Sequence, residues 1–227
     1  MLSNAVSNHA IRALRLSVGA NVTLFDGTGG EYHGVIDSID RNHVSVRIER
    51  FDAVEREWPD APILVQSIIA NDAMDSVIRK SVELGVAALQ PVYASRSQGT
   101  LAGERAEKRL AHWRGIAIAA CEQCGRNRIP PIEPPLSLDT WLRSDALQQA
   151  PAAIAGPGAP VSLAQFANLT APRHLIIGPE GGFTDAEMAL AERCGATPVH
   201  LGPRVLRADT AAVAALAMIA AVAGDAR

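Results

Sequence analysis

The feature that most constrains the fold is a change in hydrophobic periodicity near residue 60. Before it, apolar and polar residues alternate in NVTLFDG, EYHGVIDSID and HVSVRIER, and DGTGG separates the first two stretches. Such alternation is typical of half-buried strands joined by a turn. After EREWPDAP, which has the proline and charge content of a linker, the pattern changes. The sequence therefore predicts a small N-terminal β-barrel or sheet module over residues 1–60 and a second domain over 61–227.

The second domain alternates strand-length apolar runs with segments of helical period. Strands are expected over 63–70, 87–94, 152–156, 174–178 and 198–202. Helices are expected over 71–85, about Leu101 to Arg126, 137–147, 184–194 and 209–223. This order predicts an α/β fold with a mostly parallel sheet covered on both faces. In such a sheet, ligands bind beyond the carboxyl ends of the strands.

Three loops at those ends contain Gly-Pro: AGPGAP (155–160), GPEGG (178–182) and LGPRVLR (201–207). GPEGG joins a strand to a helix whose start has the capping-box spacing of Thr184 and Glu187. This arrangement can present backbone amides to a ligand, or it can be a simple tight turn. The loop lacks GxGxxG and GK[ST], and Glu180 would repel a phosphate. A neutral or cationic ligand of the adenosine type therefore fits better than a triphosphate.

Two further segments carry candidate functional arginines. LGPRVLRADTAA contains Arg204 and Arg207 and leads into a helix of almost only apolar residues. Such a helix belongs in a core or against another subunit. In EQCGRNRIP, Gly125 can end the long helix, and Arg126, Asn127 and Arg128 form a polar cluster at its exit. That cluster is either functional or a set of cations stabilising the negative end of the helix dipole.

Composition limits the classes of function. The chain is 48% hydrophobic and 20% charged, which is typical of a soluble globular protein. No apolar run is long enough to span a bilayer, and the first residues lack the pattern of a signal peptide, so a cytoplasmic protein without a membrane partner is expected. The histidines are scattered along the chain and give no basis for a metal hydrolase.

The three cysteines fit a reducing compartment. CEQC has the spacing of a metal or redox motif, but it lies inside a helical run without a second CxxC. We therefore expect two thiols on one helix face and no metal site.

The net charge of −3 does not indicate a nucleic-acid binder. Its distribution is uneven, because basic residues outnumber acidic ones over residues 96–128. A local positive excess can guide an RNA phosphate chain, although a solvated helix face explains it equally well.

Several motifs together are more specific than any one of them. IRKSVELGV (78–86), WRGIAIAACEQCGRNRIPPI (113–132), LIIGPEGGFTDAE (175–187) and LGPRVLRADTAA (201–212) follow one another in order. In sequence and separation they resemble the bacterial 16S ribosomal RNA uridine-N3 methyltransferase family of the SPOUT class. HAIRALRLSVGANVTLFDG resembles the N-terminal domain of that family.

The resemblance implies a PUA-like RNA-binding domain followed by a SPOUT domain whose end forms a trefoil knot. It also implies S-adenosylmethionine as the cofactor, bound bent in the knot loops. The partners implied are 16S rRNA in the small ribosomal subunit and a second copy of the chain. In this homodimer the last helix and the neighbouring knot surface form the interface.

Carried over residue by residue, the resemblance places the cofactor pocket on three loops. The implied residues are Ala155, Gly156, Pro157, Gly178, Pro179, Glu180, Gly181, Gly182, Leu201, Gly202, Pro203, Val205, Leu206 and Arg207. The expected reaction is an in-line methyl transfer to N3 of a uridine.

Arg126 and Arg207 are the expected donors to the developing negative charge on the uracil, with Asn127 in support. Asp209, in RADT where the family usually reads RTET, is the candidate base or orienting group. The alternatives are a related methyltransferase acting on another RNA or on a ribose hydroxyl, and a non-catalytic RNA-binding relative.

Overall fold

The computed structural model describes residues 1–41, 43–99, 103–171 and 173–224. The chain divides into two units. The first comprises Met1–Arg56 together with Gly125–Ile129, and the second comprises Glu57–Cys124 and Pro130–Arg227. Within the described ranges, no helix has both the length and the apolar character needed to cross a membrane.

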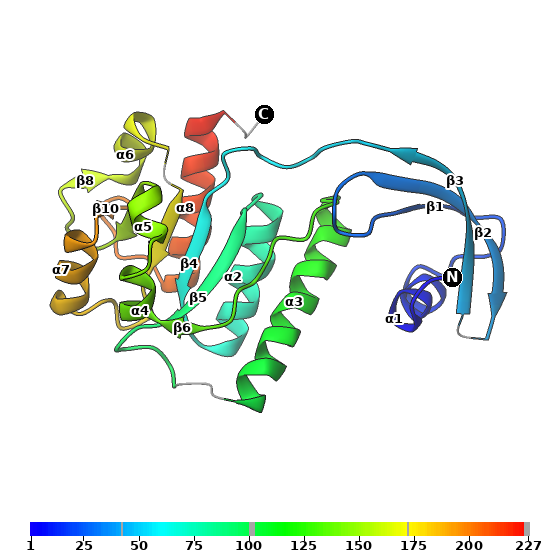
Figure 1. The fold of residues 1–227 in the computed structure, drawn as a ribbon, viewed down its shortest axis with the longest axis horizontal. Coiled ribbons are helices and arrows are strands. Elements are labelled where there is room, and N and C mark those ends of the chain that lie inside the picture. The colour runs from blue at the N-terminus through cyan, green and yellow to red at the C-terminus, as the bar shows by residue number, and fades with distance from the viewer. Residues whose placement is uncertain (42, 100–102, 172, 225–227) are drawn as a thin grey trace. The chain divides into compact units, whose positions relative to one another are not determined.

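The first unit contains an antiparallel sheet of β1 (Asn21–Leu24), β2 (Glu31–Asp40) and β3 (His43–Asp52), in that order (Figure 1). The three predicted strands are thus confirmed. Among the described residues of this unit the strands form a three-stranded sheet and not a closed barrel. Two helical turns that the sequence did not predict, α1 (Asn4–Asn8) and the π-helix η1 (His9–Ala13), precede the sheet.

The turn between β1 and β2 needs its glycines because the segment 125–129 packs on it. Gly29 N–H donates to the carbonyl of Asn127 at 3.2 Å, and Ile129 N–H donates to the carbonyl of Gly27 at 3.2 Å. Gly29 has a φ of +108°, and a Cβ there would lie 2.6 Å from the guanidinium carbon of Arg128. Any larger residue would therefore strain the backbone and displace this arginine.

The second unit is built on a seven-stranded sheet whose strand pairs are all parallel, as predicted. The order is β6-β5-β4-β9-β7-β10-β8. The strands are β4 (Ile63–Ser67), β5 (Ala88–Tyr93), β6 (Leu136–Ser137), β7 (Ala152–Ala155), β8 (Val161–Ser162), β9 (His174–Ile177) and β10 (Ala196–His200). The sequence did not predict β6 and β8, which are edge strands of two residues each.

Helices cover both faces of this sheet. They are α2 (Asn71–Glu83), α3 (Glu104–Cys124), α4 (Leu138–Leu142), α5 (Ala146–Gln149), α6 (Leu163–Leu169), α7 (Asp185–Arg193) and α8 (Ala208–Ala223). Figure 1 shows α4, α5 and α7 on one side and α2, α3 and α8 on the other. The helix predicted over 137–147 is in fact two short helices, because Arg143 ends the first one. The expected start of α3 at Leu101 lies outside the described residues.

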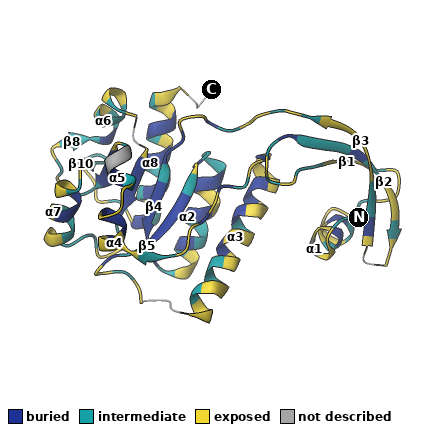
Figure 2. Cartoon of the chain, viewed as in Figure 1, coloured by how far each residue is buried: buried dark blue, intermediate teal, exposed yellow. Residues whose placement is uncertain are grey.

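The core lies between the sheet and its helices. Val65, Val92, Ile154 and Ile176 from four strands pack against Trp141 and neighbouring apolar residues of α4, α5 and α7. Figure 2 shows the central strands buried and the outer helices exposed on one side only. Burial on both faces is the reason why these strands are continuous apolar runs in the sequence. Trp58, in the predicted linker, is buried as well, so this segment is anchored to the second unit.

Candidate cofactor site

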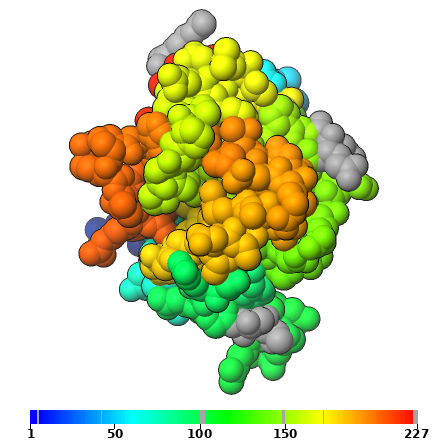
Figure 3. Space-filling model, turned by 90° about the vertical axis from the view of Figure 1, so that its left-hand side faces the viewer, coloured from blue at the N-terminus to red at the C-terminus, as the bar shows by residue number. Residues whose placement is uncertain are grey.

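A pocket of about 460 Å³ opens at the carboxyl ends of β9, β7 and β10, which are neighbours in the sheet. The loops that follow these strands are the three Gly-Pro loops of the sequence. Figure 3 faces this end of the second unit, where the loops lie at the surface. The pocket is lined by Ala155, Gly156, Pro157, Ile177, Gly178, Pro179, Glu180, Gly181, Gly182, Phe183, Asp185, Met188, His200, Leu201, Gly202, Arg204, Val205, Leu206, Ala208 and Ala211.

The structure brings together most of the residues that the resemblance implied. Two of them, Pro203 and Arg207, do not line the pocket. Eight lining residues were not among those that the resemblance implied, namely Ile177, Phe183, Asp185, Met188, His200, Arg204, Ala208 and Ala211. Of these, Arg204 had been named from the sequence as a candidate functional arginine. Most of these flank the three loops in sequence, whereas Met188 and Ala211 lie one helical turn inside α7 and α8.

GPEGG forms a tight turn held by its own backbone. Gly182 N–H donates to the carbonyl of Pro179 at 2.9 Å, and Gly182 has a φ of +67°. The carboxylate of Glu180 accepts the N–H of Ala70 at 2.8 Å, at the start of α2. A negative charge is favourable at a helix N-terminus. The glutamate that argues against a phosphate ligand therefore helps to fix the loop to its neighbour.

The helix after this loop begins with the predicted capping box. Thr184 Oγ1 accepts the N–H of Glu187 at 3.2 Å, and the Glu187 carboxylate accepts the N–H of Thr184 at 2.8 Å. The same carboxylate accepts the N–H of Ser95 at 2.7 Å. Partial burial alone would raise the pKa of Glu187, but the hydrogen bonds from Thr184 and Ser95 outweigh burial and lower it. Glu187 therefore joins α7 to the turn that follows β5.

Gly156 and Gly178 lie close to two side chains of the pocket wall, Met188 in α7 and Phe183 just before that helix. A Cβ on Gly156 would lie 2.9 Å from the Met188 methyl carbon. A Cβ on Gly178 would lie 3.2 Å from the ring of Phe183. Side chains at these positions would therefore displace the apolar wall of the pocket.

The third loop is also held by a hydrogen bond between residues close in sequence. Gly202 N–H donates to Nδ1 of His200 at 3.1 Å, and Gly202 has a φ of +113°. Arg204 and Val205 follow with exposed side chains. Arg207 is exposed and occupies the N-cap of α8, where its carbonyl accepts the N–H of Ala211 at 2.8 Å. Asp209 Oδ1 accepts the N–H of Thr210 at 2.8 Å.

The other two candidate catalytic residues, Arg126 and Asn127, belong to the first unit. Both are buried, and neither lines the pocket. Asn127 Nδ2 donates to the carbonyl of Val54 at 2.9 Å. Its Oδ1 is buried without a hydrogen-bond partner among the residues that the structure describes. Gly125, with a φ of +82°, ends α3 as predicted.

The two thiols of CEQC differ in burial. Cys121 is buried, and Cys124 is exposed. Cys121 is among the buried residues of α3, and Cys124 is the last residue of that helix. Within the described ranges, no three His, Cys, Asp or Glu side chains are grouped so that they can hold a metal ion.

Comparison with known proteins gives two family matches. The family model described as RNA methyltransferase domain matches residues 56–220. The one described as RNA methyltransferase PUA domain matches residues 2–49. Together they cover most of the chain.

Individual relatives agree with these matches. The chain is 32% identical to Ribosomal RNA small subunit methyltransferase E of Synechocystis sp., over 97% of the chain and 72% of that protein. It is 29% identical to the protein of the same name in Buchnera aphidicola, over 99% of the chain and 91% of that protein.

Two solved structures are similar over 97% of the chain and 90% of each of them. One is a Ribosomal RNA small subunit methyltransferase E from Neisseria gonorrhoeae bound to S-adenosyl methionine, with 34% identity and a TM-score of 0.88. The other is a protein from Legionella pneumophila in complex with the bound cofactor SAM, with 37% identity and a TM-score of 0.86.

Proposed function

The chain belongs to the RNA methyltransferase family, and from this premise we propose that it methylates N3 of a uridine in 16S ribosomal RNA. The methyl donor is S-adenosylmethionine. The observation that carries the proposal is the pocket built by three Gly-Pro loops at the carboxyl ends of three adjacent parallel strands. Ligands of α/β sheets bind at this position, and the similar structures named above contain S-adenosylmethionine.

The residues present fit this cofactor. A volume of about 460 Å³ lies in the range of small-molecule sites. Phe183, Met188 and Leu201 supply apolar wall, and Gly156 and Gly178 leave room that a Cβ would fill. Backbone groups of the glycine loops can bind the edges of the adenosine part. When bound, the cofactor supplies an electrophilic methyl group on a sulfonium.

The chain has to position the uracil and stabilise its charge. As the bond between N3 and the methyl carbon forms, the bond from sulfur to that carbon breaks, and the N3 proton leaves to a base. Arg126 and Arg207 are proposed to donate to the uracil oxygens, on which negative charge develops, with Asn127 in support. Asp209 is proposed to accept the proton or to orient an arginine. Holding the two reactants in line can lower the barrier by roughly 7–11 kcal/mol. This contribution is larger than that of a positioned base, which typically gives about 10²- to 10⁴-fold in rate.

The assembly proposed is a homodimer through α8. This helix is nearly all apolar, yet Ala217 and Ala221 on one side of it are exposed in the single chain. A second copy covering this side would bury apolar surface. The trefoil knot in the second domain and the cytoplasmic location are part of the same proposal.

We further propose that residues 1–60 form the PUA-like RNA-binding domain and that residues 61–227 form the SPOUT domain. The two family matches, over residues 2–49 and 56–220, support this division. The substrate is then 16S rRNA within the small ribosomal subunit.

The test is transfer of a labelled methyl group to small subunits and to free 16S rRNA that lack the modification. Nucleosides are then separated and identified by mass spectrometry. N3-methyluridine is the expected product, and Arg207→Ala should lower turnover at saturating cofactor and RNA. Arg143→Ala, an exposed ion-pair partner of Asp139 on α4, is the control. Methyl groups on ribose, or none on RNA that still binds, would contradict the proposal.

A further inference from the structure

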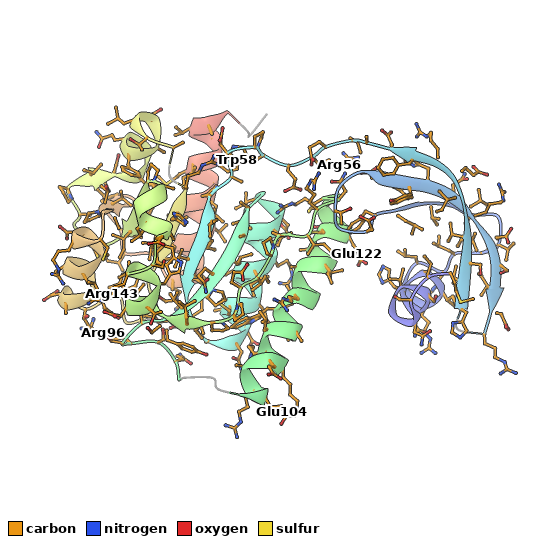
Figure 4. All side chains as sticks on the ribbon, viewed as in Figure 1. Arg56, Trp58, Arg96, Glu104, Glu122 and Arg143 are labelled. Carbon is orange, nitrogen blue, oxygen red and sulfur yellow. The ribbon has the colours of Figure 1, made fainter. Side chains whose placement is uncertain are left out.

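Arg96, in the turn after β5, contacts the loop that forms the middle of the pocket. Its Nη1 donates to the carbonyl of Gly181 at 2.8 Å. A Cβ on Gly181 would lie 3.2 Å from both Cβ and Cδ of Arg96. The stem of the arginine therefore lies along the Gly181 backbone, and its head binds the carbonyl. Arg96 itself does not line the pocket, and its side chain is exposed (labelled in Figure 4).

The turn that carries Arg96 is itself fixed. Ala94 N–H donates to Ser97 Oγ at 3.0 Å, and Ser97 N–H donates to the carbonyl of Ala94 at 3.0 Å. The intervening Ser95 N–H is bound by the Glu187 carboxylate at the start of α7. Hydrogen bonds thus fix the residues on both sides of Arg96, Ser95 and Ser97. The guanidinium therefore reaches Gly181 from a backbone whose position is defined.

Two kinds of contact fix the glycine pair of the pocket loop: hydrogen bonds within the loop and to α2, and the hydrogen bond from Arg96. Glu180 is fixed by its bond to Ala70, and the turn is closed from Gly182 to Pro179. The peptide that joins Gly181 to Gly182 carries the N–H that closes this turn, and it has glycine on both sides. Glycine loses more conformational freedom on ordering than any other residue. The bond from Arg96 holds the carbonyl side of this peptide, opposite the N–H side that the Pro179 carbonyl holds, so the two bonds together set its orientation.

We propose that Arg96 is a positioning residue of the cofactor site, which orders the Gly181–Gly182 peptide before S-adenosylmethionine binds. This inference rests on the proposed function. Its physical basis is that a preformed loop avoids part of the ordering cost of binding. Because Arg96 acts on the loop and does not touch the reacting atoms, it affects cofactor binding and not the chemical step.

The expected effects follow from one hydrogen bond. Arg96→Ala weakens S-adenosylmethionine binding about 3- to 10-fold, the range for losing one net hydrogen bond. It leaves turnover at saturating cofactor nearly unchanged. Arg96→Lys restores part of the affinity, because an ammonium on a similar stem can donate to the same carbonyl. Arg143→Ala, which removes another exposed arginine of the second unit, also labelled in Figure 4, has no effect.

A double-mutant cycle tests the contact itself. In the wild-type background, a methyl group at Gly181 presses on the stem of Arg96, so Gly181→Ala weakens cofactor binding. When Arg96 is already alanine, the stem is absent and the same substitution has little further effect. The two substitutions are therefore not additive. If the double variant instead loses cofactor affinity by the product of the two single-variant factors, the inference is overturned.

The experiment is calorimetric titration of S-adenosylmethionine into the wild-type full-length chain and these variants. Thermal melting of each variant shows that it is folded, and steady-state kinetics separates KM from kcat. If wild type and Arg96→Ala bind equally well, the inference is wrong and the proposed function stands. If wild type does not bind at all, both are wrong. A loss in Arg96→Ala that Arg96→Lys partly restores supports the inference.

Discussion

Replacing Glu187 provides the sharpest test of how the site is held together. Its carboxylate accepts three hydrogen bonds, from Thr184 N–H at 2.8 Å, Thr184 Oγ1 at 3.0 Å and Ser95 N–H at 2.7 Å. Glu187→Ala removes all three hydrogen bonds and leaves Thr184 as the only side-chain cap of α7. Two backbone N–H groups then rely on water, because the site is only partly buried.

The expected loss is about 1–3 kcal/mol in the free energy of unfolding, from two net backbone hydrogen bonds of about 0.5–1.5 kcal/mol each. Glu187→Gln keeps one acceptor oxygen and should lose about half of this amount. Glu192→Ala, at an exposed position of the same helix, is the matched control and should stay within about 0.5 kcal/mol of wild type. The measurement is urea denaturation followed by tryptophan fluorescence.

The pH dependence gives a second check on Glu187. Its folded pKa lies below the ordinary value of 4.5, so its carboxylate stabilises the fold above that pH. This contribution is lost as the pH falls through the folded pKa. The difference in stability between wild type and Glu187→Gln should therefore shrink below pH 4.5. A difference that is already absent at pH 7, or that grows in acid, would refute the reasoning.

Three further predictions follow from buried or strained groups. Burial lowers the pKa of His174 below 6.5, so the free energy of unfolding should fall as the pH drops below that value. In wild type the urea midpoint should therefore decline between pH 7.5 and 5.5, and His174→Phe should make this decline smaller. Equal declines in the two proteins would contradict this prediction. Gly202→Ala strains a residue with a φ of +113° by about 1–3 kcal/mol and should weaken cofactor binding, whereas unchanged affinity would show that the loop adapts. Asn127→Ala removes the buried donor to the Val54 carbonyl and should lower the free energy of unfolding by about 1–3 kcal/mol. Thermal melting measures this loss, and an unchanged melting temperature would contradict the prediction.

Local signals in the sequence predicted the parts of the fold that depend on local interactions. The capping box at Thr184 is present because it satisfies backbone groups within a few residues, and Gly125 ends α3 with a φ of +82° that glycine adopts easily. The same reasoning could have found α6, since Ser162 and Gln165 form a second capping box that was overlooked. The two-residue strands β6 and β8 carry no such signal, because pairing with a neighbouring strand defines them.

For the candidate site, the sequence predicted the three loops but not the residues that reach the pocket from helices. Residues that reach the pocket from helices, such as Met188 and Ala211, depend on how α7 and α8 pack, which spacing along the chain does not give. Pro203 and Arg207 were implied by the family resemblance, but they do not line the pocket. The bond from Arg96 joins residues 85 positions apart, and only the fold brings them together.

The central claim is that the GPEGG loop binds S-adenosylmethionine, and titration of the cofactor into wild type and Gly181→Val tests it most directly. Gly115→Val is the control, since a Cβ at Gly115 meets no atom within 4 Å apart from its chain neighbours and the nearby backbone of its own helix. We expect saturable binding to wild type and to the control, and its loss in Gly181→Val. Equal binding to all three proteins, or no binding to folded wild type, would contradict the claim.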